Sequence, residues 1–274
     1  MRKYLLLLTL LILFFEPLQA EPKFIIRRTR TNAGFFSAFL DIISGLDCYE
    51  KGFVAGLEVD YAKTGLYYDP LVGPNWWNYY FKPICVGNKK KAKRKIADDK
   101  YQLFNAFNVD VGMTKERANE LITRYIKIRE EIEVFVNHFK INNFDGNIVI
   151  GIHYRGTDKV TEAPRLQYEK VREEIEKHAK NDCLLFVATD EQQFLDYMIE
   201  CYGTRVLYLQ AERSTTSTPL HLAPKSPYQQ GKEALLDCLL LSKTDLLLRT
   251  SSNLSLASTY FNPLLPVIEL SRRH

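Results

Sequence analysis

Residues 151–159 read GIHYRGTDK and place four side chains suited to chemistry directly behind an apolar run. His153, Arg155, Asp158 and Lys159 follow residues 147–152, NIVIGI, a run typical of a buried strand. Ligands of open α/β sheets bind beyond the carboxyl ends of the strands. An arginine there offers a charged, two-pronged contact to an anion, and a carboxylate can accept a proton. The stretch therefore predicts a site for an anionic ligand.

Two further polar clusters occupy the same kind of position. Thr189-Asp190-Glu191 follows the apolar run CLLFVA, and Thr250-Ser251-Ser252-Asn253 follows DLLLR and opens a helical pattern. The start of a helix carries unpaired N–H groups and the positive end of the helix dipole, which favour a phosphate. An arginine, a helix start and a carboxylate for a ribose or base together describe a nucleotide site.

Each cluster also has a simpler interpretation. The two serines can be plain helix N-caps, and Asp190 can cap the helix that follows it. His153 alternates with apolar neighbours like a core histidine, and Arg155 and Asp158 can form a loop ion pair. The nucleotide interpretation is favoured because all three clusters fall at one edge of the predicted sheet.

Several common enzyme classes lack their motifs in this chain. No glycine-rich phosphate loop is present, which argues against dehydrogenases and ATPases. There is no G-x-S-x-G elbow and no H-E-x-x-H pair. The other histidines are scattered without metal-ligand spacing: His138, His178, His221 and His274. We therefore expect neither a metal-dependent hydrolase nor a serine esterase.

Two textures along the chain predict two α/β lobes. From about Asn143 onward, strand-like runs alternate with helical patterns, which predicts a parallel sheet with helices on both faces. The earlier part, residues 22–142, is richer in aromatic residues and less regular, with helices predicted at 34–48 and 114–139. Between them, the basic run NKKKAKRK at 88–95 predicts a solvated loop, with an anionic surface or acidic acceptor as the alternative.

The first 20 residues have the layout of a signal peptide. Arg2 and Lys3 precede the apolar stretch 4–15, and Ala20 offers a small residue for cleavage. The stretch is shorter than the roughly 20 residues of a bilayer span, so a cleaved signal is favoured over an uncleaved anchor. We expect a protein of the secretory pathway or one associated with a membrane.

The net charge bears on nucleic-acid binding, and the cysteine content bears on disulfide bonds. Without residues 1–20 the chain carries 35 Lys+Arg (37 − 2) and 32 Asp+Glu (33 − 1), a net charge of +3 that does not imply nucleic acid. The five cysteines show no dense disulfide spacing, so at most two bridges form. Cys183 and Cys238 stand in apolar runs and are predicted to be buried.

Three stretches resemble motifs of the core and rhizobial-type fucosyltransferases. IGIHYRGTDK looks like their first motif, H-x-R-R-T-D-K, and FVATDE looks like their second. LLDCLLLSKTDLLLRTSSNLS is similar to their third, in which D-x-x-x-L-S-x-x-D leads into T-x-S-S. RTRTNAGFFSAFLDII and GLYYDPLVGPNWWNYYFKPI resemble their acceptor-side lobe. The resemblance covers most of residues 27–270.

The resemblance implies a GT-B glycosyltransferase with two Rossmann-like lobes. An acceptor-side lobe at 21–142 would face a nucleotide-sugar-binding lobe at 143–274, and fucose would pass from GDP-fucose to a glycan hydroxyl with inversion. Arg155 would bind the pyrophosphate, Ser252 a phosphate oxygen, and His153 and Asp190 the nucleoside. Thr250 and Ser251 are further candidates for donor binding because of their place at the helix start. No metal or other cofactor would be needed.

The chain also departs from these motifs. Gly156 stands where the first motif has its second arginine, and Glu162, the candidate base, follows Lys159 one residue earlier than in the core enzymes. Asp158 is the next candidate for the base. These departures keep open a silent nucleotide-sugar or glycan binder, and a different GDP-sugar or a protein acceptor is a third possibility.

Overall fold

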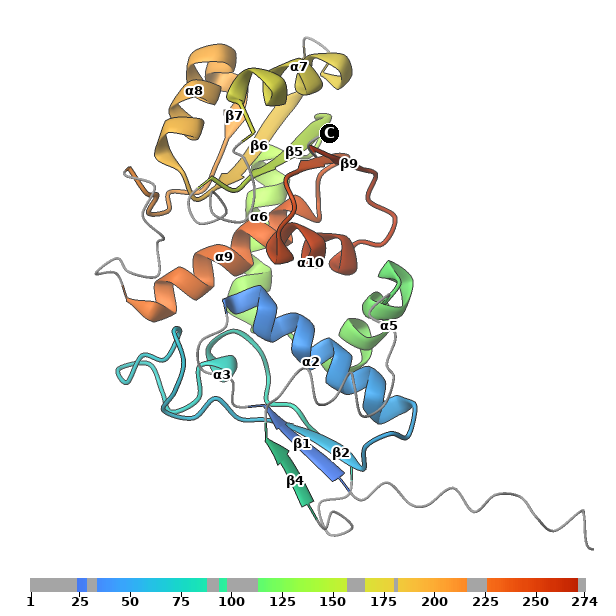
Figure 1. Cartoon of the computed structure of the whole chain (residues 1–274). Helices are drawn as coiled ribbons and strands as arrows, with labels where there is room; N and C mark the ends of the chain where they lie inside the picture. The colour runs from blue at the N-terminus through green and yellow to red at the C-terminus, as the bar shows by residue number, and fades with distance from the viewer. Residues whose placement is uncertain are drawn as a thin grey trace, which may run out of the picture.

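The computed structural model describes residues 24–28, 34–87, 94–97, 113–156, 166–179, 182–215 and 226–270. Two lobes are stacked along the long axis of the molecule (Figure 1). The signal-peptide prediction for residues 1–20 lies outside these ranges, and the lobe boundary at residue 142 stays a prediction. No helix within them has the length and apolar character needed to cross a bilayer.

The N-terminal lobe is built on a small sheet. Its strands lie in the order β3-β2-β1-β4, with β1 (Phe24–Arg28), β2 (Gly56–Val59) and β4 (Arg94–Ala97) parallel and β3 (Cys85–Gly87) antiparallel to β2. The helices α2 (Phe35–Glu50), α3 (Trp77–Tyr80) and α5 (Lys115–Tyr125) complete the lobe.

The C-terminal lobe is a five-stranded parallel sheet in the order β7-β6-β5-β8-β9. Its strands are β5 (Val149–Tyr154), β6 (Leu184–Thr189), β7 (Val206–Leu207), β8 (Leu246–Arg249) and β9 (Val267–Glu269). Helices α7 (Tyr168–His178) and α8 (Gln192–Tyr202) pack on one face. On the other face lie α6 (Glu130–Asn143), α9 (Pro227–Leu241) and α10 (Asn253–Phe261). The α/β class and the helices on both faces are confirmed.

Apolar packing explains why the lobes stay together. Every residue of β5 is buried, as expected of a central parallel strand covered on both faces. One core runs from α2 and α3 through α9 and α10 to the sheet, and α10 packs against α9, α5 and α2. Cys183 and Cys238 are buried as predicted.

Two sequence predictions in the N-terminal half are corrected. The single helix at 114–139 is two helices, α5 and α6, because Ile128 forms a bridge with Phe81 and Arg129 N–H donates to the Tyr80 carbonyl at 2.9 Å. This extended segment turns the chain between them. In the basic run, Arg94 and Lys95 belong to β4, where the backbone pairs with β1, and are not part of a loop. Residues 88–93 lie outside the described ranges.

Candidate functional site

His153 and Arg155 lie at the carboxyl end of β5, where the order of strands in the sheet reverses. From β5 the chain proceeds outward through β6 and β7, then returns to place β8 on the other side of β5. The crevice between the carboxyl ends of β5 and β8 is therefore the position at which such sheets bind ligands. Thr250 Oγ1 accepts the Arg155 N–H at 3.0 Å, and Thr250 N–H donates to the His153 carbonyl at 2.9 Å. The ends of the two strands are thus tied together.

Asp190 joins this arrangement from β6. Its Oδ1 accepts the Gly156 N–H at 3.0 Å, so the turn after β5 is held from both neighbouring strands. Residue 191, not Asp190, is the N-cap of α8, and its side chain makes no capping bond. The capping interpretation of Asp190 is therefore wrong, and its carboxylate instead fixes the backbone beside Arg155.

The start of α10 supplies the third group. Ser252 is the N-cap, and its side chain accepts the Leu254 N–H at 3.3 Å, so the capping interpretation holds for this serine. Ser251 is exposed, whereas Ser252 is buried. Ser255 donates to the carbonyls of Thr250 and Ser252 at 3.1 and 3.2 Å, which fastens the first turn to the end of β8.

His153 is neutral in this setting. Its side chain is buried at the end of β5, and its pKa is lowered to about 3, first by burial and then by the positive charges of Arg155 and Arg249. Nδ1 has no hydrogen-bond partner among the described residues. The described residues therefore do not support the interpretation of His153 as a core histidine with both nitrogens hydrogen-bonded. A neutral imidazole can form hydrogen bonds with an uncharged base or sugar.

Gly156, which departs from the first motif, packs closely against Glu191 and Tyr154. A Cβ at Gly156 would lie 2.1 Å from Glu191 Oε2 and 3.0 Å from Tyr154 Cε1. Glu191 is buried, so its carboxylate has no open solvent into which to turn. A side chain at position 156 would therefore require the buried Glu191 side chain to move.

Sequence reasoning missed a buried carboxyl group on α9. Asp237 is buried, which raises its pKa to about 7, while the Arg213 guanidinium acts in the opposite direction. Arg213 belongs to the segment that reaches Asp190, since the Ser214 N–H donates to the Asp190 carbonyl at 2.9 Å. An aspartate inside the apolar run ALLDCLLL was the available signal.

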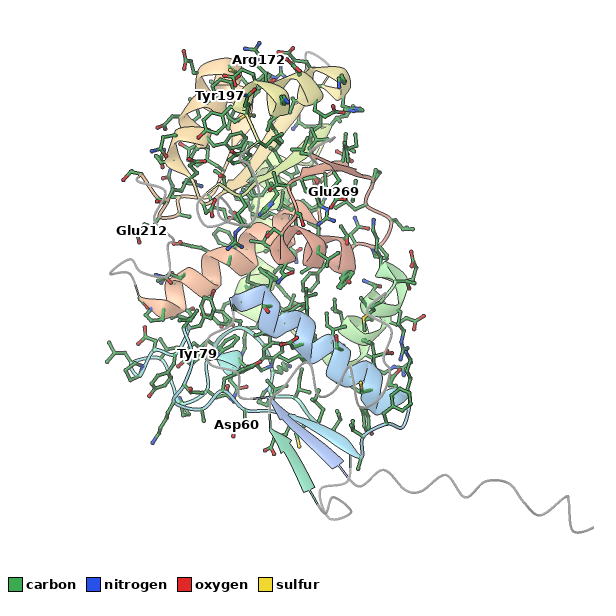
Figure 2. The ribbon with its side chains drawn as sticks, viewed as in Figure 1. Asp60, Tyr79, Arg172, Tyr197, Glu212 and Glu269 are labelled. Atoms are coloured by element: carbon green, nitrogen blue, oxygen red, sulfur yellow. The ribbon has the colours of Figure 1, made fainter. Side chains whose placement is uncertain are left out.

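The N-terminal lobe reaches the site through Tyr67. Its hydroxyl accepts the Phe35 N–H at 3.0 Å. Burial raises the Tyr67 pKa, while that bond and the nearby Arg155 charge lower it. A Cβ at Gly231 of α9 would lie 2.3 Å from the Tyr80 hydroxyl and 3.2 Å from Tyr67 Cδ1. Figure 2 shows Tyr79 in this aromatic region, below α9. Arg155 thus lies where the two lobes meet.

Solved structures similar to this chain include fucosyltransferases. The NodZ alpha-1,6-fucosyltransferase soaked with GDP-fucose matches with a TM-score of 0.61 and 19% identity, over 90% of this chain and 94% of that one. The enzyme NodZ from Bradyrhizobium matches at 0.58 and 20%, over 92% and 96%. POFUT1 in complex with GDP matches at 0.52 and 10%, over 92% and 99%. No protein-family model matches the sequence, and no curated protein does.

The chain has a fucosyltransferase-like GT-B fold.

The GT-B arrangement accounts for the position of the predicted site residues. His153, Arg155, Asp190, Thr250 and Ser252 lie together at the carboxyl edge of the C-terminal sheet. The remaining predicted residues, Asp158, Lys159 and Glu162, lie outside the described ranges. In the parts of the chain that the structure describes, no three His, Cys, Asp or Glu side chains gather as a metal site would require. The metal-free mechanism stays a prediction.

Proposed function

We propose that the protein is a glycosyltransferase that moves fucose from GDP-fucose to a hydroxyl of a glycan, with inversion and without a metal ion. The observation that carries this proposal is the tie between β5 and β8, in which Thr250 Oγ1 accepts the Arg155 N–H at 3.0 Å at the switch point of the sheet. It sets an arginine beside the start of α10. The solved structures of similar fold that contain GDP or GDP-fucose support the choice of donor.

Arg155 and the start of α10 would stabilise the leaving group. When the bond between the sugar C1 and the β-phosphate oxygen breaks, negative charge develops on GDP. A guanidinium and helix N–H groups aimed at that oxygen can neutralise this charge as a divalent ion would. Thr250, Ser251 and Ser252 border the same position, so we assign them to the phosphates.

The nucleoside would lie toward His153 and Asp190. The neutral imidazole can donate or accept one hydrogen bond at each nitrogen, depending on its tautomer. The Asp190 carboxylate already accepts the Gly156 N–H with Oδ1, and it retains acceptor capacity for a hydroxyl. These two residues would orient the donor for attack at C1.

Deprotonation of the acceptor hydroxyl needs a carboxylate on the far side of the donor sugar. We assign this role to Glu162, with Asp158 as the second candidate and Lys159 as a neighbouring cation. The acceptor oxygen would form its bond to C1 as the bond to GDP breaks, and the proton would pass to the carboxylate. Attack from the side opposite to GDP gives inversion.

The N-terminal segment bears on where the reaction takes place. We propose that residues 1–20 direct the chain to the secretory pathway or hold it at a membrane, because Arg2 and Lys3 precede the apolar stretch 4–15. A glycan or glycoconjugate acceptor is compatible with either location.

One observation favours a second candidate function. The packing of Glu191 against Gly156 leaves one arginine fewer at the end of β5 than the resembling motif has. A protein that binds the nucleotide sugar or a glycan without turning it over would tolerate that loss. GDP binding without release of GDP from GDP-fucose would identify this case.

The decisive experiment compares donors side by side. The purified chain is incubated with GDP-fucose, GDP-mannose or UDP-glucose and a panel of glycan and protein acceptors, in EDTA, and products are detected by mass spectrometry. We expect fucose addition to a glycan from GDP-fucose alone. Transfer from a different donor, transfer to a protein hydroxyl, or activity abolished by EDTA would each overturn the corresponding part of the proposal.

A further inference from the structure

The diphosphate of the proposed donor has more negative charge than Arg155 alone can neutralise. A nucleoside diphosphate carries several negative charges near neutral pH, and anions of this kind are usually held by more than one charged donor. Position 156 supplies no second one, because it is a glycine packed close to Glu191. Among the described residues, a second cation can come from a neighbouring strand at the same edge of the sheet.

Arg249 is the last residue of β8 and lies in register with His153 of β5. Alternation along β8 buries Leu248 with α7 and α8, and Leu247 with α9 and α10. Arg249 therefore shares the α10 face with Leu247. Along β5 the same alternation puts Ile152 on the α7 and α8 face and His153 on the α10 face. Arg249 thus stands beside His153 at the carboxyl edge, under the start of α10.

The guanidinium of Arg249 reaches the first turn of that helix. Its Nη1 donates to Ser255 Oγ at 3.3 Å, and its Nη2 donates to Glu269 Oε1 of β9 at 2.8 Å. Figure 2 shows Glu269 on β9 beside α10. A guanidinium has five N–H groups, and these two bonds use only some of them. Nε is buried without a hydrogen-bond partner among the described residues.

The positive charge of Arg249 acts on His153 at the candidate site. The charges of Arg155 and Arg249 both lower the pKa of His153, after the larger effect of burial. Two guanidinium groups at the carboxyl ends of neighbouring strands therefore lie close to one imidazole. A bound anion would be attracted by both charges.

We propose that Arg249 is a second phosphate-binding residue, which supplies from β8 a cation that Gly156 does not provide. The identity of the diphosphate as that of GDP-fucose rests on the proposed function. Arg249 would contact the phosphates from below the start of α10, with Ser255 and Glu269 holding its guanidinium plane in place.

The competing explanation is that Arg249 only forms an ion pair with Glu269. Arg249 is largely buried and Glu269 is half exposed, so the pair is only partly screened by solvent. The two explanations differ in what the loss of the arginine does to ligands with and without phosphates.

The test measures binding of guanosine, GMP, GDP and inorganic pyrophosphate by calorimetry to the wild-type chain and three variants. Arg249→Gln removes the cation, and Arg249→Lys keeps the charge without the planar fork. Arg205→Gln removes an equal charge at the opposite edge of the sheet, where Arg205 Nε donates to the Cys183 carbonyl at 3.0 Å. Melting temperatures confirm that each variant is folded.

We expect Arg249→Gln to weaken GDP binding roughly 10- to 100-fold and to leave guanosine binding unchanged. The GDP affinity of Arg249→Lys should lie between those of the wild type and Arg249→Gln. The GDP affinity of Arg205→Gln should match that of the wild type. Equal GDP affinity in Arg249→Gln and wild type would overturn the proposal, as would equal losses for guanosine and GDP. If the wild type binds pyrophosphate but no guanine nucleotide, the proposed donor is wrong. Weaker pyrophosphate binding by Arg249→Gln would in that case still support a phosphate-binding role for Arg249. A wild type that binds neither overturns both.

Discussion

Substituting Gly156 by alanine puts a methyl group where the structure has a carboxylate. The new Cβ would lie 2.1 Å from Glu191 Oε2 and 2.8 Å from Glu191 Cδ, so one side must move by more than 1 Å to reach ordinary contact. Because Glu191 is buried, we expect the cost of overpacking, about 1–3 kcal/mol, and a fall in melting temperature of roughly 3 to 10 °C.

The same shift should reach the proposed chemistry. The Gly156 N–H is bonded to Asp190 and the preceding N–H to Thr250, so a displaced turn moves Arg155 relative to the start of α10. Misplacement of a catalytic group by about 1 Å can cost roughly 10²-fold in rate. We therefore expect weaker GDP binding and slower turnover together.

A double-mutant cycle identifies the cause. Glu191→Ala removes the atoms that the new methyl group would meet, so Gly156→Ala should cost far less in that background. Gly73→Ala is the control, because its Cβ would meet nothing closer than 3.4 Å. Urea unfolding and GDP calorimetry provide the readouts. Our reasoning is refuted if Gly156→Ala is as stable and active as wild type, or if its penalty persists unchanged without the Glu191 side chain.

Three further outcomes follow from the structure and the proposed site. The His153 ring should show no NMR titration between about pH 5 and pH 8, because its pKa in the folded protein is lowered to about 3. As the pH falls below about 6.5, His153 of the unfolded chain takes up a proton before His153 of the folded chain does. The contribution of His153 to the free energy of unfolding is therefore lost as the pH falls. Arg117→Ala should cost about 1–3 kcal/mol in urea unfolding, because it leaves two largely buried α2 carboxylates without that guanidinium, whereas the half-exposed Lys51→Ala should cost less than about 1 kcal/mol. Asn253, in the sequon Asn-Leu-Ser at the exposed start of α10, should carry no glycan in active protein, and mass spectrometry showing full occupancy would contradict our placement of the donor phosphates.

The C-terminal lobe was predictable because its pattern is local. Apolar runs of strand length alternate with helical periodicity, and parallel strands bring their carboxyl ends to one edge. His153, Arg155, Asp190 and Thr250 therefore converge as predicted. Ser252 shows that a cap and a candidate phosphate position can be the same residue.

The errors arose where contacts distant in sequence decide the structure. Ile128 ends the predicted long helix because it pairs with Phe81, and nothing in the periodicity of 114–139 reports that partner. Arg94 and Lys95 look like loop residues by charge, yet their backbone completes a sheet with β1. Local pattern does not encode such pairings.

The residues missed at the site share this cause. Arg249 is placed beside His153 by strand register, and Glu191 comes against Gly156 through the turn that Asp190 holds. Asp237 is placed by the packing of α9 against the sheet. For Arg249 and Glu191, the residue type alone was compatible with a solvated strand end and a helix start.

Binding of GDP in EDTA to the wild type and to Arg155→Ala tests the central claim most directly. We expect the wild type to gain about 2.7 kcal/mol of stability at a GDP concentration a hundredfold above Kd, with no divalent ion present. Arg155→Ala should lose most of that gain, measured relative to its own unliganded melting temperature. A stabilisation that vanishes with EDTA, or one that Arg155→Ala retains in full, would contradict a metal-free donor site built around Arg155.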